Sequence, residues 1–84
     1  MQIARTETFR KAWKKLSQED KVLGRKVIMN LAVGIRYPGL KVNEMSETGN
    51  IREARVSDTV RLTFQVEGDT LILRNIGQYE TQQS

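Results

Sequence analysis

The spacing of apolar residues changes once along this chain of 84 residues, and that change limits the possible folds more than any other feature. Up to about residue 37 the apolar residues recur every three to four positions, which is the period of an amphipathic helix. From Ile51 onward, β-branched and aromatic runs alternate with polar residues and are separated by turn residues, as in antiparallel strands. The chain is therefore predicted to be α+β.

The N-terminal part predicts, in order, a strand at 2–5, a helix at about 8–16 and a helix that begins near residue 18. Thr6 or Thr8 is expected to cap the first helix, and Ser17 the second, because a side-chain oxygen can accept from an unpaired backbone N–H. Tyr37-Pro38-Gly39 is expected to end the second helix. The two helices are predicted to form an antiparallel hairpin with one apolar side.

Three strands are predicted to follow, at residues 51–56, 60–66 and 70–76, after a loop at 39–50 with a brief extended start at 40–42. Alternation sends five apolar side chains toward the helices: Ala54, Val56, Leu62, Phe64 and Val66. It sends five others to the opposite side: Glu53, Arg55, Arg61, Thr63 and Gln65. The predicted architecture is an N-terminal strand and a helical hairpin packed on one face of a small, mainly antiparallel sheet, in a single domain over residues 1–84.

Composition limits the chemistry. Fourteen Lys and Arg against ten Asp and Glu give a net charge of +4, which favours a polyanionic partner. The chain has no cysteine and no histidine, so a thiolate metal site and the commonest general base are both excluded. Catalysis would have to use Lys, Arg, Tyr or carboxylates, and no cofactor or metal is expected. No signal-peptide or membrane-spanning run is found, so a cytoplasmic protein with no membrane partner is expected.

Arg55 and Arg61 flank a predicted tight turn on the open side of the sheet. Two guanidinium groups held on neighbouring strands would bind a phosphodiester and stabilise the charge that develops during its cleavage. The alternative, which the pattern alone favours, is that each arginine pairs with a surface acid such as Glu53 or Asp58.

Lys41 and Tyr79 are further candidates on the same side. Lys41 would reach this side from the loop, or else it is one more surface lysine. Tyr79 would transfer a proton or stack on a base, or else its ring covers the core. The cationic side of the first helix is interpreted as solvated, and Trp13 as part of the core.

A pattern of four segments runs through the chain in a fixed order: Leu40-Lys41, NIREARVSD at 50–58, VRLTF at 60–64 and LILRNIG at 71–77. This ordered set resembles the RelE/ParE superfamily of toxins from type II toxin–antitoxin systems. The resemblance implies a metal-independent endoribonuclease, an mRNA interferase, that cuts messenger RNA on the ribosome and inhibits translation. The 2′-hydroxyl would attack the adjacent phosphate. The implied partners are a cognate antitoxin and mRNA on the ribosome.

The resemblance also implies roles for the residues of this chain that stand at the positions of the family's site residues. The resemblance implies that Arg61 stabilises the transition-state phosphate, that Arg55 assists and that Lys41 matches the family's loop lysine. Arg61→Ala should then abolish growth inhibition while leaving folding near normal. Three more residues are expected to bind substrate: Arg52, Glu53 and Arg74.

The chain departs from the pattern after Gly77, where relatives often carry histidines and this chain has Gln78, Tyr79 and Glu80. Tyr79 is the expected acid, and Glu44 or Glu53 the expected base, with the alternative that Glu53 holds Arg55 in place. Two alternative functions remain open. One is a ParE-like toxin that binds a protein target such as DNA gyrase, and the other is a non-catalytic nucleic-acid-binding member of the fold.

Overall fold

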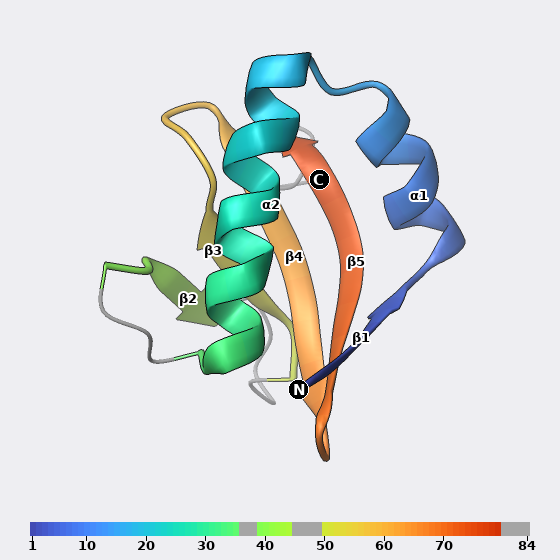
Figure 1. The fold of residues 1–84 in the computed structure, drawn as a ribbon, viewed down its shortest axis with the longest axis vertical. Helices are drawn as coiled ribbons and strands as arrows, with labels where there is room; N and C mark the ends of the chain where they lie inside the picture. Colours follow the sequence, from blue (N-terminus) through green and yellow to red (C-terminus); the bar gives the residue numbers. More distant parts are fainter. Residues whose placement is uncertain (36–38, 45–49, 80–84) are drawn as a thin grey trace.

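The computed structural model describes residues 1–35, 39–44 and 50–79. Its elements are β1 (Gln2–Arg5), α1 (Glu7–Lys14), α2 (Gln18–Val33), β2 (Val42–Glu44), β3 (Arg52–Arg55), β4 (Val60–Glu67) and β5 (Thr70–Gln78). The strands form one sheet in the order β1-β5-β4-β3-β2. β1 runs parallel to β5, and the other neighbours are antiparallel (Figure 1). The predicted α+β class with a mainly antiparallel sheet is confirmed.

Both helices begin at expected capping residues, and at the first helix the cap is Thr6 and not the alternative Thr8. The Thr6 side chain accepts a hydrogen bond from the Phe9 N–H, and the Ser17 side chain accepts one from the Asp20 N–H, each at 3.1 Å. The second helix, however, ends at Val33 and not at Tyr37. Gly34 takes an extended conformation there, and because glycine is among the weakest helix formers, the helix stops at the first one near its C-terminal end. The predicted stop at 37–38 lies outside the described residues.

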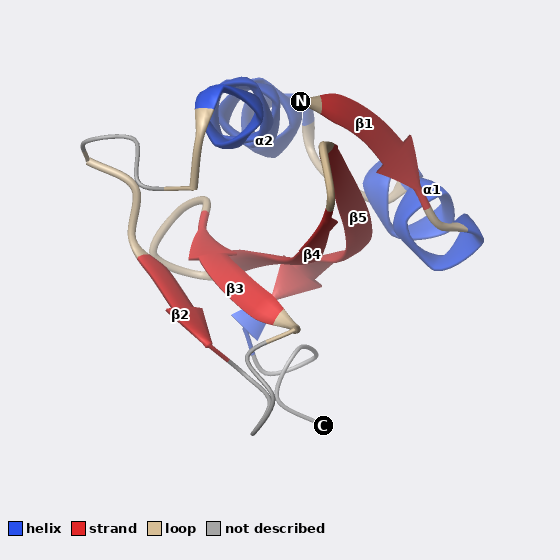
Figure 2. Ribbon diagram, turned by 90° about the horizontal axis from the view of Figure 1, so that it is seen from below, coloured by secondary structure: helices blue, strands red, loops and turns tan. Residues whose placement is uncertain are grey.

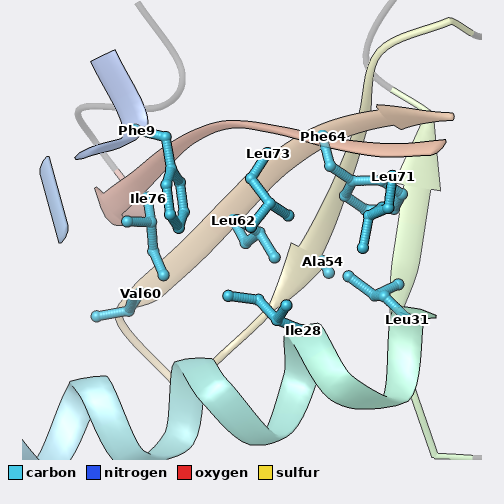
Figure 3. Packing of buried hydrophobic residues seen from close by; sticks show 10 residues of the cluster. All are labelled: Phe9, Ile28, Leu31, Ala54, Val60, Leu62, Phe64, Leu71, Leu73 and Ile76. Carbon is cyan, nitrogen blue, oxygen red and sulfur yellow. The ribbon is translucent and has the colours of Figure 1, made fainter. Parts of the chain in front are cut away.

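The core lies between the two helices and one face of the sheet. Phe9 from α1, with Ile28 and Leu31 from α2, packs against the side chains of the central strands (Figure 3). These strand residues are Ala54, Val60, Leu62, Phe64, Leu71, Leu73 and Ile76. The alternation predicted for β4 is confirmed, because Leu62 and Phe64 are fully buried on this side.

Trp13 joins the core where the two helices meet. Its ring lies 5.7 Å from that of Phe9, centroid to centroid, and it packs over the backbone of α2 at Gly24. A Cβ atom at Gly24 would stand 2.9 Å from Cζ3 of Trp13, so only glycine allows this close approach. Trp13 is therefore part of the packing, as predicted, and not a platform for stacking bases.

Two features of the sheet differ from the prediction. Residues 42–44 form an edge strand against β3, where the sequence indicated a loop with only a brief extended start. β5 contains a bulge, because Thr63 pairs with Asn75 and Phe64 pairs with Leu73, which leaves Arg74 without a place in the register. The Thr6 hydroxyl donates to the Arg74 carbonyl at 2.8 Å, so the bulge lies where the chain passes from β1 into α1.

None of the described helices is long and apolar enough to cross a membrane.

Candidate functional site

The candidate site lies on the open face, which we define as the face of the sheet opposite α2. Figure 2 shows α2 above the sheet, with the lower face of β3 and β4 turned away from it. This face is polar, as predicted, yet two of its central side chains are buried. Glu53 is 8% exposed, and its cross-strand neighbour Thr63 is 7% exposed.

Three cations lie side by side at one end of the open face. Arg55 and Arg61 are directly opposite each other on β3 and β4. The Arg55 N–H donates to the Lys41 carbonyl at 3.1 Å. Lys41 therefore lies directly opposite Arg55, on the side of β3 that faces away from β4. Side chains of opposed residues in antiparallel strands point to the same face, roughly 5 Å apart at Cβ. We call this set of Lys41, Arg55 and Arg61 the cationic row.

Arg61 is the most constrained member of the row. Its Nη1 donates to the carbonyls of the turn between β3 and β4, at 2.6 Å to Ser57 and 3.3 Å to Asp58. It also donates to the carbonyl of Val60 at 3.1 Å, and the side chain is only 16% exposed. Because the guanidinium donates to backbone carbonyls of the turn, we now expect Arg61→Ala to lower stability, where the sequence alone predicted folding near normal.

Tyr79 lies against this arginine. The Arg61 guanidinium carbon is 4.8 Å from the centre of the phenol ring, within the range of a cation–π contact. The Tyr79 N–H donates to the Thr59 carbonyl at 2.7 Å, which fixes the end of β5 beside the turn. Tyr79 is 39% exposed, so its ring contacts Arg61 and also faces solvent.

Both arginines also have the acidic partners that the alternative interpretation named. Arg55 forms a salt bridge with Asp58, whose side chain is 89% exposed. Oε1 of Glu53 lies 3.9 Å from Nε of Arg61, which is an electrostatic contact and too long for a hydrogen bond. The two interpretations are thus compatible: the arginines are neighbours, and each is partly neutralised. The Arg55–Asp58 pair is exposed, so solvent and salt screen it and it contributes little to stability.

The other predicted substrate-binding residues lie elsewhere. Arg52 pairs with Phe64 and Glu44, so it belongs to the helix side of the sheet and is not brought to Arg61. Arg74 donates to Gln65 on the open face. Gln65 is four residues along β4 from Arg61, a separation of roughly 13 Å. The attachment of Arg61 to the turn carbonyls was missed, because side-chain patterns carry no signal for contacts with backbone oxygens.

Comparison with known proteins shows which solved structures have the same fold as this chain. No protein-family model and no curated protein sequence matches the chain. Among solved structures, a copper-bound mutant toxin from Helicobacter pylori has a TM-score of 0.80 at 22% identity, covering 96% of this chain and 97% of the other. A RelB-RelE antitoxin–toxin complex from Methanococcus jannaschii gives 0.78 at 17% identity, covering 95% and 94%. YafQ from E. coli gives 0.76 at 18% identity, covering 98% and 97%.

These structures agree with the present chain over nearly their whole length. Within the described ranges, no three His, Cys, Asp or Glu side chains are grouped so that they could hold a metal ion. What this chain shares with these solved structures is its fold, two helices and a five-stranded mixed sheet. By its architecture, this chain has the RelE-like toxin fold.

Proposed function

We propose that this protein is the toxin of a type II toxin–antitoxin system and acts as a metal-independent endoribonuclease on mRNA in the ribosome. The observation that carries the proposal is the cationic row beside Tyr79 on the open face. The fold shared with RelE and YafQ supports it. The proposed setting is the cytoplasm, and the proposed partner is a cognate antitoxin, like the RelB of the related complexes.

The row matches the needs of phosphodiester cleavage. Attack of a 2′-oxygen on phosphorus expels the 5′-oxygen and leaves a 2′,3′-cyclic phosphate and a 5′-hydroxyl. Negative charge develops on the phosphate oxygens, and guanidinium groups held in place stabilise it. Arg61 is held by the turn carbonyls through Nη1, and among the described residues no hydrogen bond from its Nη2 is found, so Nη2 is the donor that we assign to the phosphate.

The other side chains near Arg61 bind the phosphate, transfer protons or position Arg61 in the proposed cleavage. Arg55 leaves its exposed partner Asp58 and binds the phosphate together with Lys41. The partly exposed phenol of Tyr79 donates a proton to the leaving 5′-oxygen. Glu53 is buried beside Arg61 and positions it. Glu44 pairs with Arg52 on the helix side of the sheet, which leaves a group of the ribosome to accept the proton of the 2′-hydroxyl. Arg52 has no part, because it lies on the helix side of the sheet.

Expression of the chain in bacteria tests the proposal. Growth should stop, and primer extension should show cuts within translated message that carry 5′-hydroxyl ends. Arg55→Ala should reduce cleavage at least tenfold, since Arg55 is 39% exposed and can be removed without disturbing the core. Lys26→Ala on α2 removes the same charge from an exposed position outside the site and should cleave normally.

Two results would contradict the proposal. Growth arrest with intact message and inhibited DNA supercoiling would indicate a toxin that acts on gyrase. Binding of RNA with neither cleavage nor arrest would indicate a nucleic-acid-binding module without catalysis.

A further inference from the structure

A groove of about 610 Å³ lies along the outer edge of β5, between that strand and α1. The two elements lie side by side in Figure 1. β1 pairs with β5 only from Thr70 to Leu73, so among the described residues no strand covers β5 from Asn75 to Gln78. A groove of this volume is large enough for one nucleotide. We call it the edge groove, and its charged and amide side chains are Lys11, Lys15, Asp20, Asn75 and Gln78.

The edge groove meets the cationic row at Gly77, which lines the groove. Gly77 is paired with Arg61, on the side of Arg61 that faces away from Arg55. Opposed Cα atoms of antiparallel strands lie roughly 5 Å apart. Gly77 has no side chain that could stand between Arg61 and the groove. A ligand bound on the row therefore has a path of one strand width into the edge groove.

One side of α1 gives the groove a positive wall. Thr8, Lys11 and Lys15 line it, and their spacing of three and four residues places them on one face of the helix and its C-terminal cap. Both lysines are exposed, and Asp20 is the one carboxylate among the described lining residues. Two ammonium groups on neighbouring turns of one face suit a phosphate.

The opposite wall is the unpaired backbone of β5. The Tyr79 N–H donates to the Thr59 carbonyl, and hydrogen-bonded pairs alternate along antiparallel strands. Ile76 and Gln78 therefore turn their backbone N–H and carbonyl groups away from β4. The Ile76 N–H donates to the Asn75 side-chain oxygen at 2.9 Å, and within the described part of the chain the Asn75 amide nitrogen donates to no other group. Amide and backbone groups of this kind recognise the edges of a nucleobase.

An unpaired strand edge also suits an extended peptide, but two observations favour RNA. The Ile76 N–H already bonds to the Asn75 side chain, so an added strand would have to displace that side chain to pair there. The groove is also continuous with the row that holds RNA in the proposed function, and it carries two lysines against one carboxylate.

We propose that the edge groove binds the nucleotide next to the one that is cleaved at the cationic row. Lys11 and Lys15 bind its phosphate, while the amides of Asn75 and Gln78 bind its base. The choice of RNA as the ligand rests on the proposed function. The groove thereby adds affinity for the strand and selects the base at one position beside the cut.

Binding of short RNAs to the full chain tests the groove without cleavage. The probes are fluorescent tetranucleotides with 2′-O-methyl groups, which cannot be cut through the 2′-oxygen. Lys15→Ala should weaken binding about three- to tenfold by fluorescence anisotropy and reduce the salt slope by up to about 0.7, the share of one phosphate. Lys14→Ala removes the same charge at the next residue, which does not line this groove, and should change affinity less than about twofold.

Base selection is tested with probes that differ in one base at a time. The unchanged chain should prefer one base at a single position, and Gln78→Ala should reduce that preference about two- to fivefold. Asn75→Ala should reduce it too, with a loss of stability because the Ile76 N–H loses its acceptor. Gln65→Ala, whose amide does not line the groove, is the control and should keep the preference. Thermal unfolding checks the fold of each variant.

Three results would overturn the inference: no binding of any probe, equal effects of the two lysine variants, or an unchanged preference in both amide variants. Displacement of the probes by an extended glutamate-rich peptide, with amide shift changes at 75–78, would assign the groove to a protein strand instead. Cleavage on ribosomes separates this failure from that of the proposed function. Normal cleavage and base preference in Lys15→Ala and Gln78→Ala would contradict the groove alone. Probe binding through the groove with no cleavage of message would contradict the nuclease alone.

Discussion

Arg61 combines a structural and a chemical role in one side chain. A guanidinium carries five N–H donors, and this one uses Nη1 for backbone carbonyls while its face contacts Tyr79. Glu53 beside it is almost fully buried, so removing Arg61 would leave that carboxylate without its nearby cation. A variant that loses activity here does not by itself identify a catalytic residue, and stability has to be measured alongside.

Arg61→Ala should lower the free energy of unfolding by about 1–3 kcal/mol, because the turn carbonyls lose their donor. Arg61→Lys keeps the positive charge near Glu53 and should cost less, yet it should still lose activity because lysine lacks the planar fork. Urea denaturation measures both. An alanine variant as stable as the wild-type chain would show that the turn does not depend on Arg61.

Asp58 competes with phosphate for Arg55. Asp58→Asn should raise affinity for single-stranded RNA about two- to fivefold, since it frees Arg55 and removes a negative charge from the edge of the site. Anisotropy titrations at low salt measure this. Asp69→Asn, in the turn between β4 and β5, is the charge-matched control and should have a smaller effect, because Asp69 lies at the far end of β4. Equal effects would mean that only net charge matters.

At the scale of elements, the contact between α1 and α2 depends on one missing side chain. Gly24 allows the Trp13 ring to lie on the α2 backbone, and the same ring is held by Phe9 and Arg25. The bulge at Arg74 is a second such device, because it lets both Leu73 and Ile76 face the core although they are three residues apart.

Gly24→Ala should destabilise the chain by about 1 kcal/mol or more, although alanine is the better helix former. The gain in helix propensity, about 1 kcal/mol, is smaller than the cost of moving a packed indole. Gly34→Ala is the matched control, since a Cβ there meets nothing within 4 Å, and it should be neutral or slightly stabilising. Thermal unfolding compares them. A stabilised Gly24→Ala variant would show that Trp13 can shift freely.

At the scale of the whole molecule, the cations are divided among several surfaces. The cationic row lies on the open face, and the edge groove continues from it along β5. Other cations lie around β1, α1 and α2 on the helix side, namely Arg5, Arg10, Lys14 and Arg25. Only the first two surfaces, which meet at Gly77, are proposed to bind RNA.

RNA affinity should fall with salt according to the number of phosphates that the row contacts. The three cations of the row should contribute about −2 to the slope of the logarithm of the binding constant against the logarithm of salt concentration. Arg55→Ala should reduce this slope by about 0.7. Lys14→Glu, on the helix side, should leave the slope nearly unchanged. If Lys14→Glu reduced it as much as Arg55→Ala, RNA would be bound on the helix side.

The sequence by itself determined the class of the fold, the Ser17 cap of α2 and the core alternation of β4, because these depend on periodicity and on neighbours within a few positions. It also placed Arg55 and Arg61 across one turn, since a short turn fixes the register of its two strands. Only the tertiary structure decided where Arg52 points, that Lys41 joins the row, and that Arg61 is held by backbone carbonyls. Those outcomes depend on pairing between distant segments and on contacts with main-chain atoms, which every residue carries and no sequence pattern distinguishes.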